Sequence, residues 1–300
     1  MLDFRVETFL AVCRHMNFTK AARELNITQP AVSHHIHYLE QAYGTALFQH
    51  NGKRLQLTEA GEILRRTLLT MKHDEQHLQK RMQQAASGTR DYSFGATLSV
   101  AEFMLNEALG RFLQLHPDSH IQMQVADTKV LLSKLDSGEL DFAVVEGDFP
   151  KAEYDFFVFG TEEYVAAGDP EKAARYRGRR LTDLLVEPLL LREEGSGTRV
   201  ILEYYLKEHG LAAADFARTV EIGNIGAIKT LLKSGYGVSF LYRAAIRPEE
   251  AAGTLGVIEL SDFRLRHDIM FLFPKNSNFR ADYTAIFREL RACAEETGSA

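Results

Sequence analysis

NFTKAARELNITQPAVSHHIHYLE, residues 17–40, decides the fold of the N-terminal part of the chain. Two short helical patterns meet there at a tight corner, and in the second pattern Thr28 can cap a helix whose first turn holds Pro30. Apolar residues recur along the second pattern at helical spacing, namely Val32, Ile36 and Leu39. Polar or small residues form its opposite face, namely Gln29, Pro30, Ser33, His34 and His37. Such a pair indicates a helix-turn-helix motif, although a helix pair in any all-α domain would have the same spacing.

A longer set of residues in this stretch resembles the LysR-type transcriptional regulators. The resemblance is carried by Phe18, Thr19, Ala21, Ala22, Leu25, Thr28, Gln29, Pro30, Ala31, Ser33, Ile36, Leu39 and Glu40. It continues through Leu47, Phe48 and residues 57–61, and in looser form it covers all 300 residues. It implies a multi-domain protein with an N-terminal winged helix-turn-helix, a long linker helix, and a C-terminal two-lobed α/β regulatory domain like a periplasmic binding protein. It also implies a regulator that binds operator DNA and is not an enzyme.

The same resemblance assigns roles to residues of the DNA-binding segment. Residues expected at base edges or the nearby backbone are Gln29, Pro30, Ser33, His34 and His37, and those expected at phosphates are Thr28, Lys53 and Arg54. Lys53 and Arg54 stand at the basic tip of a hairpin predicted over residues 46–58, where their charge would equally fit a solvated tip. Histidines at positions 34, 35 and 37 stand where the family commonly has arginine, glutamine and arginine. Because imidazole changes its charge between pH 5 and 8, we expect DNA binding that depends on pH.

Composition and charge fit a DNA-binding protein with more than one domain. The 300 residues, 45% of them apolar, can form two or three domains. The net charge of −6 is unevenly divided, because residues 1–87 contain 11 Lys and Arg against 8 Asp and Glu, whereas the remainder contains 24 against 33. We expect neither a signal peptide nor a membrane span, because the first residues carry charges and form no long apolar run, and the two cysteines, Cys13 and Cys293, fit a reducing compartment. We therefore expect a cytoplasmic protein without a membrane partner.

A long helix is predicted over residues 59–85, after a cap at Thr58. Its apolar residues alternate spacings of four and three, as in a coiled-coil seam, and are Leu64, Leu68, Met71, Leu78 and Met82. Because this seam is short and Glu75 interrupts it, a single helix packed on its own domain is the alternative. The resemblance implies paired linker helices in a dimer and a dimer of dimers, and it allows RNA polymerase as a further partner. The predicted domains are residues 1–58, 59–87 and 88–300.

Beyond the linker helix, strands and helices alternate, which is the pattern of a parallel α/β fold. The pattern occurs twice, because residues 130–145 and residues 227–242 each contain a helix closed by Ser-Gly and followed by a buried strand. We infer two similar lobes. The resemblance implies that the chain crosses between them twice. Crossings placed near residues 161–165 and 261–266 give one lobe of residues 90–161 with 267–300 and a second lobe of residues 162–266.

Two facing lobes create a cleft, and ligands in open α/β sheets bind beyond the carboxyl ends of the strands. The residues predicted to bind an effector there are Thr97, Ser99, Glu146, Ser196, Gly197, Thr198 and Asn224. Hydroxyls and backbone N–H groups at helix starts favour a small anionic molecule, whereas plain capping of the helices would explain the same residues. A carboxylate at Glu146 would repel an anion unless the ligand supplies it with a hydrogen-bond donor.

The sequence contains no coherent catalytic or metal-ligand pattern. Gly195-Ser196-Gly197 lacks the spacing of a nucleophile elbow, and neither a phosphate-binding loop nor zinc-ligand spacing is present. We therefore expect no cofactor and no metal. Two alternatives to an effector-responsive regulator remain open. One is a regulator whose cleft is closed by its own side chains, and the other is a solute-binding or enzymatic α/β domain with an incidental helical N-terminus.

Overall fold

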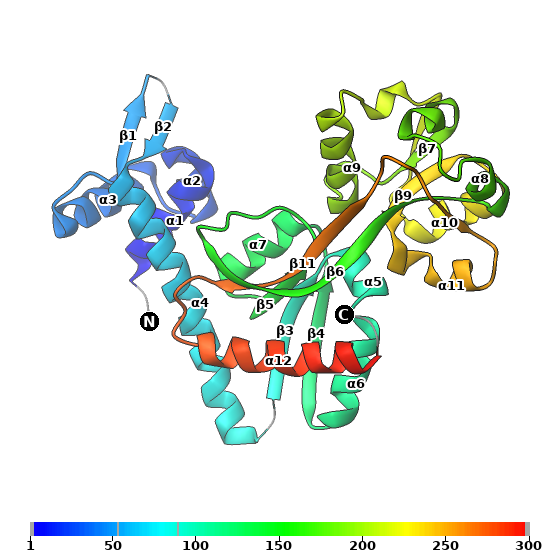
Figure 1. Ribbon diagram of the computed structural model, residues 1–300. Coiled ribbons are helices and arrows are strands. Elements are labelled where there is room, and N and C mark those ends of the chain that lie inside the picture. Colours follow the sequence, from blue (N-terminus) through cyan, green and yellow to red (C-terminus); the bar gives the residue numbers. More distant parts are fainter. Residues whose placement is uncertain (1–2, 53, 89, 298–300) are drawn as a thin grey trace.

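The N-terminal part of the chain folds as a winged helix-turn-helix that continues into a long helix (Figure 1). The computed structural model describes residues 3–52, 54–88 and 90–297. The elements of this part are α1 (Phe4–His15), α2 (Phe18–Glu24), α3 (Gln29–Tyr43), β1 (Phe48–Asn51), β2 (Arg54–Leu57) and α4 (Glu59–Ser87). The predicted helix pair, hairpin and linker helix are all confirmed.

Local sequence sets both ends of α3. The side-chain oxygen of Thr28 accepts a hydrogen bond from the backbone N–H of Ala31 at 3.3 Å, and Pro30 occupies the first turn. Gly44 ends the helix with φ 68°, in the left-handed region that glycine enters without steric cost. The apolar residues Val32, Ile36 and Leu39 are buried in the N-terminal core, so the predicted inner face of this helix is confirmed.

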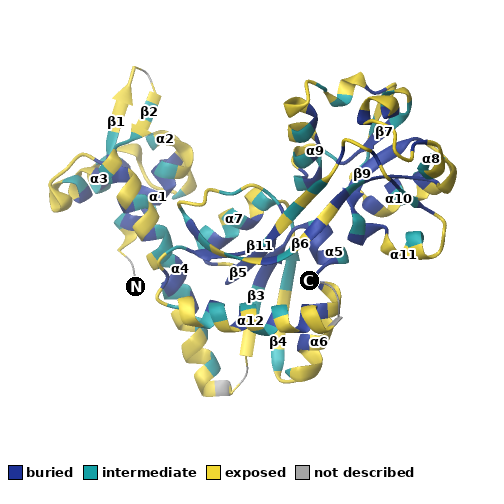
Figure 2. Ribbon diagram, viewed as in Figure 1, coloured by how far each residue is buried: buried dark blue, intermediate teal, exposed yellow. Residues whose placement is uncertain are grey.

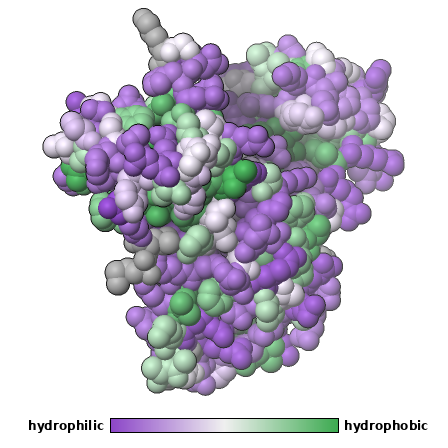
Figure 3. All heavy atoms as spheres, turned by 90° about the vertical axis from the view of Figure 1, so that its left-hand side faces the viewer, coloured by the Kyte–Doolittle hydropathy of each residue, from purple (hydrophilic) through white to green (hydrophobic). Residues whose placement is uncertain are grey.

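The first turns of α4 belong to the N-terminal core. Leu64 and Leu68 are buried there in one cluster with Phe9, so their predicted place on a dimer seam is wrong, because their own domain already covers them. Met71, Leu78 and Met82 are 48%, 48% and 67% exposed and point away from that core. On the face of the molecule turned to the viewer in Figure 3, scattered apolar patches interrupt a largely hydrophilic surface.

The C-terminal part is an α/β structure with two lobes (Figure 1). One sheet of nine strands runs from the first lobe into the second. The strands are β3 (Arg90–Ala96), β4 (Ser119–Val125), β5 (Phe142–Val145), β6 (Tyr154–Gly168), β7 (Pro188–Leu191), β8 (Arg218–Glu221), β9 (Val238–Tyr242), β10 (Gly256–Ile258) and β11 (Leu265–Pro274). Their order is β4-β3-β5-β11-β6-β9-β7-β8, with β10 beside β6. In the first lobe β3 pairs in parallel with β4 and β5, and in the second β7 pairs in parallel with β8 and β9. The predicted internal repeat is therefore confirmed.

Two long antiparallel strands carry the chain between the lobes. β6 runs through the first predicted crossing without a break, and β11 begins within the second. The two strands pair from Leu265 opposite Tyr164 to Pro274 opposite Tyr154, with an irregularity between Ile269 and Met270. The crossings are thus hydrogen-bonded strands rather than loops, which ties the two lobes into one sheet.

Helices cover the sheet in both lobes. They are α5 (Leu98–Phe103), α6 (Asn106–Leu115), α7 (Thr128–Ser137), α8 (Pro170–Arg175), α9 (Gly197–Glu208), α10 (Ile225–Lys233), α11 (Arg247–Ala251) and α12 (Arg280–Thr297), with the 3₁₀ turns η1 (Leu181–Val186), η2 (Ala213–Asp215) and η3 (Arg243–Ala245). The segment from Thr97 to Leu115 forms two helices, α5 and α6, because the backbone leaves helical geometry at Met104.

The largest core spans the sheet from one lobe to the other. Phe142 on β5 stacks on Phe94 at 4.8 Å and on Phe271 at 4.6 Å between ring centroids, so neighbouring strands are held by aromatic contacts as well as by hydrogen bonds. Figure 2 shows these central strands as largely buried. Among the described residues, no helix has the length and apolar character needed to cross a membrane.

We predict that Gly61→Ala destabilises the N-terminal domain. A Cβ at Gly61 would lie 2.1 Å from the carbonyl oxygen of Leu47 and 2.8 Å from Cδ2 of Leu57, so α4 or the hairpin would have to move. Overpacking of this kind costs about 1–3 kcal/mol of unfolding free energy. Denaturant unfolding followed by circular dichroism measures the change.

Gly110→Ala is the matched control, because a Cβ at this position on α6 would meet no atom within 4 Å. It should stabilise the chain by roughly 0.5–1 kcal/mol, the usual gain from replacing glycine within a helix. Equal unfolding free energies for the two variants would show that α4 and the hairpin are not closely packed.

Candidate DNA-reading surface and effector cleft

The outer face of α3 presents most of the side chains predicted to read DNA. Gln29, Pro30, His34 and His37 are exposed, and Ser33 is half-buried. The amide nitrogen of Gln29 donates to the hydroxyl of Ser33 at 2.9 Å, and a ring nitrogen of His37 lies 3.0 Å from the amide nitrogen of Gln41. Each contact joins side chains four residues apart, so it orients polar groups on successive turns of α3. A row of oriented polar side chains on one exposed face is typical of a recognition helix.

The hairpin adds a positive charge to the surface of the N-terminal domain. Arg54 opens β2 and is exposed, and Thr28 is exposed at the start of α3 while its hydroxyl caps the helix. Lys53, predicted beside Arg54 at the tip, lies outside the described residues. A guanidinium and a helix N-terminus are both groups that suit phosphate oxygens.

His35 does not belong to the outer face. Its Nδ1 lies 3.0 Å from the hydroxyl of Thr8 on α1, and its ring meets the ring of Phe4 edge-on at 4.8 Å. Burial, together with the charges of Arg5 and His34, lowers the pKa of His35. Helical spacing turns position 35 toward α1, so of the three histidines only His34 and His37, the two predicted on the outer face, are exposed there.

In the regulatory domain, a small cavity lies where the two lobes meet. Its volume is about 230 Å³, and it is lined by Thr97, Leu98, Val125, Ala126, Asp127, Glu146, Arg192, Glu193, Ser196 and Gly197. Four of the predicted effector residues thus come together from both lobes. The carboxyl ends of β3, β4, β5 and β7 all lead into this cavity, as the rule for open α/β sheets requires.

Glu146 is the central polar group of the cavity. It follows β5, it is only 3% exposed, and the hydroxyl of Thr97 donates a short hydrogen bond to its carboxylate. Gly197 allows this carboxyl to lie close to the start of α9, because a Cβ there would approach Cγ of Glu146 to 3.3 Å. Burial raises the pKa of Glu146 to about 7, although its own backbone N–H and the charge of Arg192 act in the opposite direction. The carboxyl therefore takes up or releases a proton near neutral pH.

The helix-capping alternative can be compared residue by residue. Among the described residues, neither the Thr97 nor the Ser196 hydroxyl makes a side-chain capping hydrogen bond, although both stand at N-cap positions. Thr97 bonds Glu146 instead, and Ser196 lies 2.8 Å from the hydroxyl of Thr198. Asn224, by contrast, caps α10 by accepting from the N–H of Ala227 at 2.9 Å. Helix capping thus explains Asn224, but it does not explain the hydroxyls of Thr97 and Ser196.

Three of the predicted effector residues are not on the cavity wall, as far as the described chain shows. Ser99 and Thr198 are each 1% exposed and lie beneath the surface, and Asn224 is exposed elsewhere on the second lobe. The carbonyl of Thr198 accepts a hydrogen bond from the hydroxyl of Tyr164 at 2.7 Å, so this threonine supports the start of α9 from below.

Arg192 is the cavity residue that sequence reasoning missed. It is 6% exposed, and its guanidinium pairs with both carboxylate oxygens of Glu193 at 2.7 Å. A positive charge in this position can bind an anion if Glu193 turns away. Arg192 directly follows β7, so the rule about carboxyl ends of strands would have found it.

A larger cavity opens outward from the first and shares Glu146 and Gly197 with it. It has a volume of about 600 Å³, and its lining includes Thr128, Lys129, Val200, Tyr204, Leu265 and His267. The hydroxyl of Thr128 and Nδ1 of His267 are buried there without a hydrogen-bond partner among the described residues. Unpaired buried polar atoms are uncommon, so they mark this wall as a place for a ligand or ordered water.

Family comparisons agree with this geometry. Residues 85–294 match the LysR substrate binding domain, and residues 5–62 match the bacterial regulatory helix-turn-helix of the lysR family. The chain belongs to the LysR family of transcriptional regulators. It is therefore a DNA-binding regulator with an effector-binding domain and not an enzyme, which confirms the resemblance and the fold class expected from the sequence.

Individual relatives extend over nearly the whole chain. A RuBisCO operon transcriptional regulator from Acidithiobacillus ferrooxidans is 28% identical, covering 97% of this chain and 94% of its own. The regulator CfxR of Cupriavidus necator is 30% identical, covering 86% and 80% respectively. Among solved structures, full-length LysG of Corynebacterium glutamicum with bound effector Arg has a TM-score of 0.62 at 18% identity and covers 99% of both chains. The CcmR regulatory domain of Synechocystis in complex with 2-PG has a TM-score of 0.61 at 20% identity and covers 69% of this chain and 98% of its own.

We predict that Glu146→Gln stabilises the protein increasingly as pH rises. Folding raises the pKa of Glu146 from an ordinary 4.5 to about 7, so the folded state retains a proton that the unfolded state loses between these values. Wild-type stability from this group therefore falls across that interval, by at most about 3 kcal/mol. Glutamine does not titrate. Melting temperatures of both proteins between pH 4.5 and 8 measure the difference.

The matched control is Glu208→Gln, which changes an exposed carboxylate in the outer cavity. It should leave the melting temperature unchanged at each pH. A difference between Glu146→Gln and wild type that is the same at pH 5 and pH 8 would contradict the raised pKa of Glu146.

Proposed function

We propose that this regulator binds double-stranded operator DNA through α3 and the hairpin, and that it alters its grip on DNA when a small molecule occupies the cavity between the lobes. The observation that carries this proposal is the meeting of Thr97, Glu146, Arg192 and Ser196 at one small cavity. These groups come from both lobes, so a ligand bound to them draws the lobes together. We place the protein in the cytoplasm, where its DNA target lies.

Roles in DNA binding follow from exposure and chemistry. Gln29, Pro30, Ser33, His34 and His37 contact base edges or the adjacent backbone. Thr28, Lys53 and Arg54 contact phosphates. The support for this assignment is the exposed polar face of α3 and the exposed guanidinium of Arg54 on the hairpin. Because the usual arginines of the recognition helix are replaced by histidines, phosphate contacts from the hairpin supply a larger share of the affinity.

The proposed effector is a small anion that also has a hydrogen-bond donor. Arg192, the hydroxyls of Thr97 and Ser196, and the N-terminus of α9 suit an anionic group. Glu146 faces the same space and accepts hydrogen bonds when it is ionised, so a ligand with no donor would be repelled. The bound effector Arg in one structural neighbour and the 2-PG in complex with the other support a small-molecule effector for this chain.

We propose that α4 forms the interface between two copies of the chain. Met71, Leu78 and Met82 are exposed, and Ile63 extends this apolar stripe toward the DNA-binding domain. Such a stripe gains stability when a second α4 covers it, which gives a dimer and, through a second contact, a dimer of dimers. A partly palindromic operator would match this two-fold arrangement, and RNA polymerase would be contacted from the DNA-bound form.

We predict that Thr97→Ala and Ser196→Ala weaken the effector response and leave basal DNA binding intact. Each variant removes one hydroxyl from the cavity, and a hydrogen bond to a charged group corresponds to roughly 10- to 100-fold in affinity. Thermal shift of the full chain with small carboxylates, inorganic anions and aromatic acids measures ligand binding. Mobility shift on the DNA upstream of the gene measures basal binding.

Asn224→Ala is the matched control, because it removes a helix cap outside the cavity and should not change ligand affinity. Loss of basal DNA binding in the Thr97 and Ser196 variants would make their turns structural. A ligand panel that shifts no melting temperature would favour a regulator whose cleft is closed.

We predict that wild-type protein binds its upstream DNA more tightly at pH 6 than at pH 8. His34 and His37 are exposed on α3, and imidazolium attracts phosphate whereas neutral imidazole does not. Two exposed ion pairs correspond to roughly 2- to 30-fold in affinity. A His34→Gln and His37→Gln double variant should lose this ratio in a mobility shift.

The control is His35→Gln, which should lower stability through its contact with Thr8 and keep the pH ratio. Equal ratios in wild type and the double variant would refute the role of the two outer histidines. If no DNA shift occurs at either pH, the proposed operator role itself is wrong.

A further inference from the structure

The linker helix α4 is fastened to the regulatory domain by buried polar side chains. Asp141 is 3% exposed, and its carboxylate accepts hydrogen bonds from Nδ1 of His77 at 3.3 Å and from Nζ of Lys80 at 2.9 Å, both on α4. One turn earlier, Nε2 of His73 lies 2.9 Å from the carbonyl oxygen of Leu140. Buried polar groups in such a network fix one arrangement, because any other leaves a group unpaired.

Asp141 also stands at the end of the strand that leads to the cleft. It directly precedes β5, and Glu146 directly follows it. The four residues of β5 are at most 1% exposed, and the strand lies between β3 and β11. At about 3.3 Å per residue, the anchor of α4 is roughly 16 Å from the cavity carboxyl along one extended segment. Since this segment is packed on all sides, a displacement at one end is transmitted to the other.

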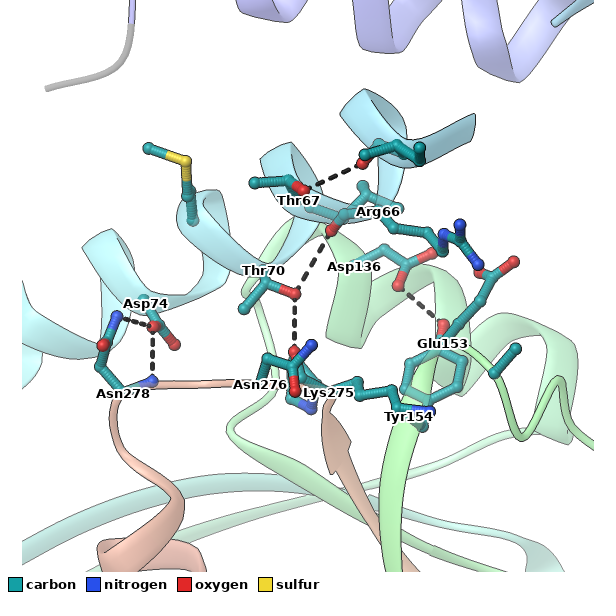
Figure 4. Close-up of a pocket in the computed structure, with 15 residues that line it drawn as sticks. Arg66, Thr67, Thr70, Asp74, Asp136, Glu153, Tyr154, Lys275, Asn276 and Asn278 are labelled. Atoms are coloured by element: carbon teal, nitrogen blue, oxygen red, sulfur yellow. Dashed lines mark hydrogen bonds between the residues drawn. The ribbon is translucent and has the colours of Figure 1, made fainter. Parts of the chain in front are cut away.

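Two more strands, β11 beside β5 and β6 beyond β11, also end at α4. Arg65 of α4 pairs with Glu153, directly before β6, at 2.5 Å. Just beyond β11, the carbonyl of Lys275 accepts from the hydroxyl of Thr70 at 3.0 Å, and the carboxylate of Asp74 accepts from the N–H of Asn278 at 2.9 Å (Figure 4). β6 and β11 are the strands that cross between the lobes. α4 therefore contacts one end of each of three adjacent strands, β5, β11 and β6. The opposite end of β5 leads to the cleft, and β6 and β11 continue toward the second lobe.

We infer that Asp141 is the positioning residue through which occupation of the cleft at Glu146 reaches α4, an inference that rests on the effector role proposed above for Glu146. α4 is attached at the ends of three strands, β5, β6 and β11. Of these, β5 is the strand that leads directly from its attachment to α4, at Asp141, to the cavity residue Glu146. Ligand contact with Glu146 displaces β5, and Asp141 passes the displacement to His77 and Lys80. The direction of α4 then changes, and with it the position of the DNA-binding domain that α4 carries.

Groups around Asp141 agree with a charged anchor. Besides α4, the carboxylate accepts the backbone N–H of Ser93 on β3 at 2.8 Å. Burial acts to raise the pKa of Asp141, but the hydrogen bonds from His77, Lys80 and Ser93 outweigh it and the pKa is lowered. On the other side of His77, Nε2 lies 3.6 Å from the carboxylate of Asp282 on α12. Asparagine at position 141 would keep the shape and remove the charge that holds Lys80.

Hydrogen exchange of the full-length chain, followed by mass spectrometry, tests this inference without knowledge of the effector. Glu146→Gln serves as the perturbation of the cleft. We expect it to change the exchange rate of peptides from residues 68–84 of α4 by about 2- to 30-fold, the usual range for coupling between sites. In an Asp141→Asn background the same substitution should produce no further change in these peptides. A residue that merely holds α4 would shift the baseline and leave the response to Glu146→Gln unaltered.

Two more variants keep the test decisive. Asp136→Asn is the matched control, because this half-buried carboxylate of the same lobe accepts a hydrogen bond from the hydroxyl of Tyr154 and lies off β5, so the response of α4 should persist. Lys80→Met leaves the bond from Ser93 to Asp141 intact and should diminish the response even if Asp141→Asn does not fold.

The outcomes separate this inference from the proposed function. If Glu146→Gln alters peptides around the cavity but not those of α4, the inference is wrong and the effector role stands. The inference is also wrong, and the effector role again stands, if α4 responds equally with Asp or Asn at position 141. If neither the cavity nor α4 responds, both the inference and the effector role of Glu146 are overturned.

Discussion

Antiparallel pairing of β6 with β11 is the contact on which the rest of the regulatory domain depends. These two strands are the middle of the sheet order, with the first lobe attached on one side and the second on the other. Each lobe alone is a small parallel sheet with its own helices. Pairing of the crossing strands brings the carboxyl ends of both sheets to one place, and that place is the cavity around Glu146. The geometry of the cleft is therefore a property of the crossing and not of either lobe.

Much of this architecture could be predicted from the sequence, because it follows from local rules. Thr28, Pro30 and the spacing of Val32, Ile36 and Leu39 define α3 through capping and periodicity, and these are properties of neighbouring residues. The repeated helix, Ser-Gly and strand of the two lobes is local in the same sense. The resemblance to a known family then supplied the order of the domains.

What could not be predicted depends on contacts between distant segments. Helical spacing already leaves His35 off the outer face of α3, but its partner, the hydroxyl of Thr8 on α1, is known only from the fold. Leu64 and Leu68 fit a seam by spacing, but the N-terminal core covers them. Thr97 and Asn224 look alike as helix caps, and only the carboxyl of Glu146 distinguishes them. The place of Arg192 at the cleft could have been predicted, because it directly follows a strand. Its burial and its ion pair with Glu193 are known only from the fold.

The shared core of α4 and the DNA-binding domain has a mechanical consequence. Because Leu64 and Leu68 are part of that core, the domain and the start of the helix move together, with no joint between them. α4 has 29 residues, which at 1.5 Å per residue is a rod of about 44 Å. A rotation of about 5° around its middle would shift each end by roughly 2 Å, more than half the 3.4 Å rise of one base pair. A change too small to alter any contact within the helix would thus be enough to move a recognition helix out of step with its bases.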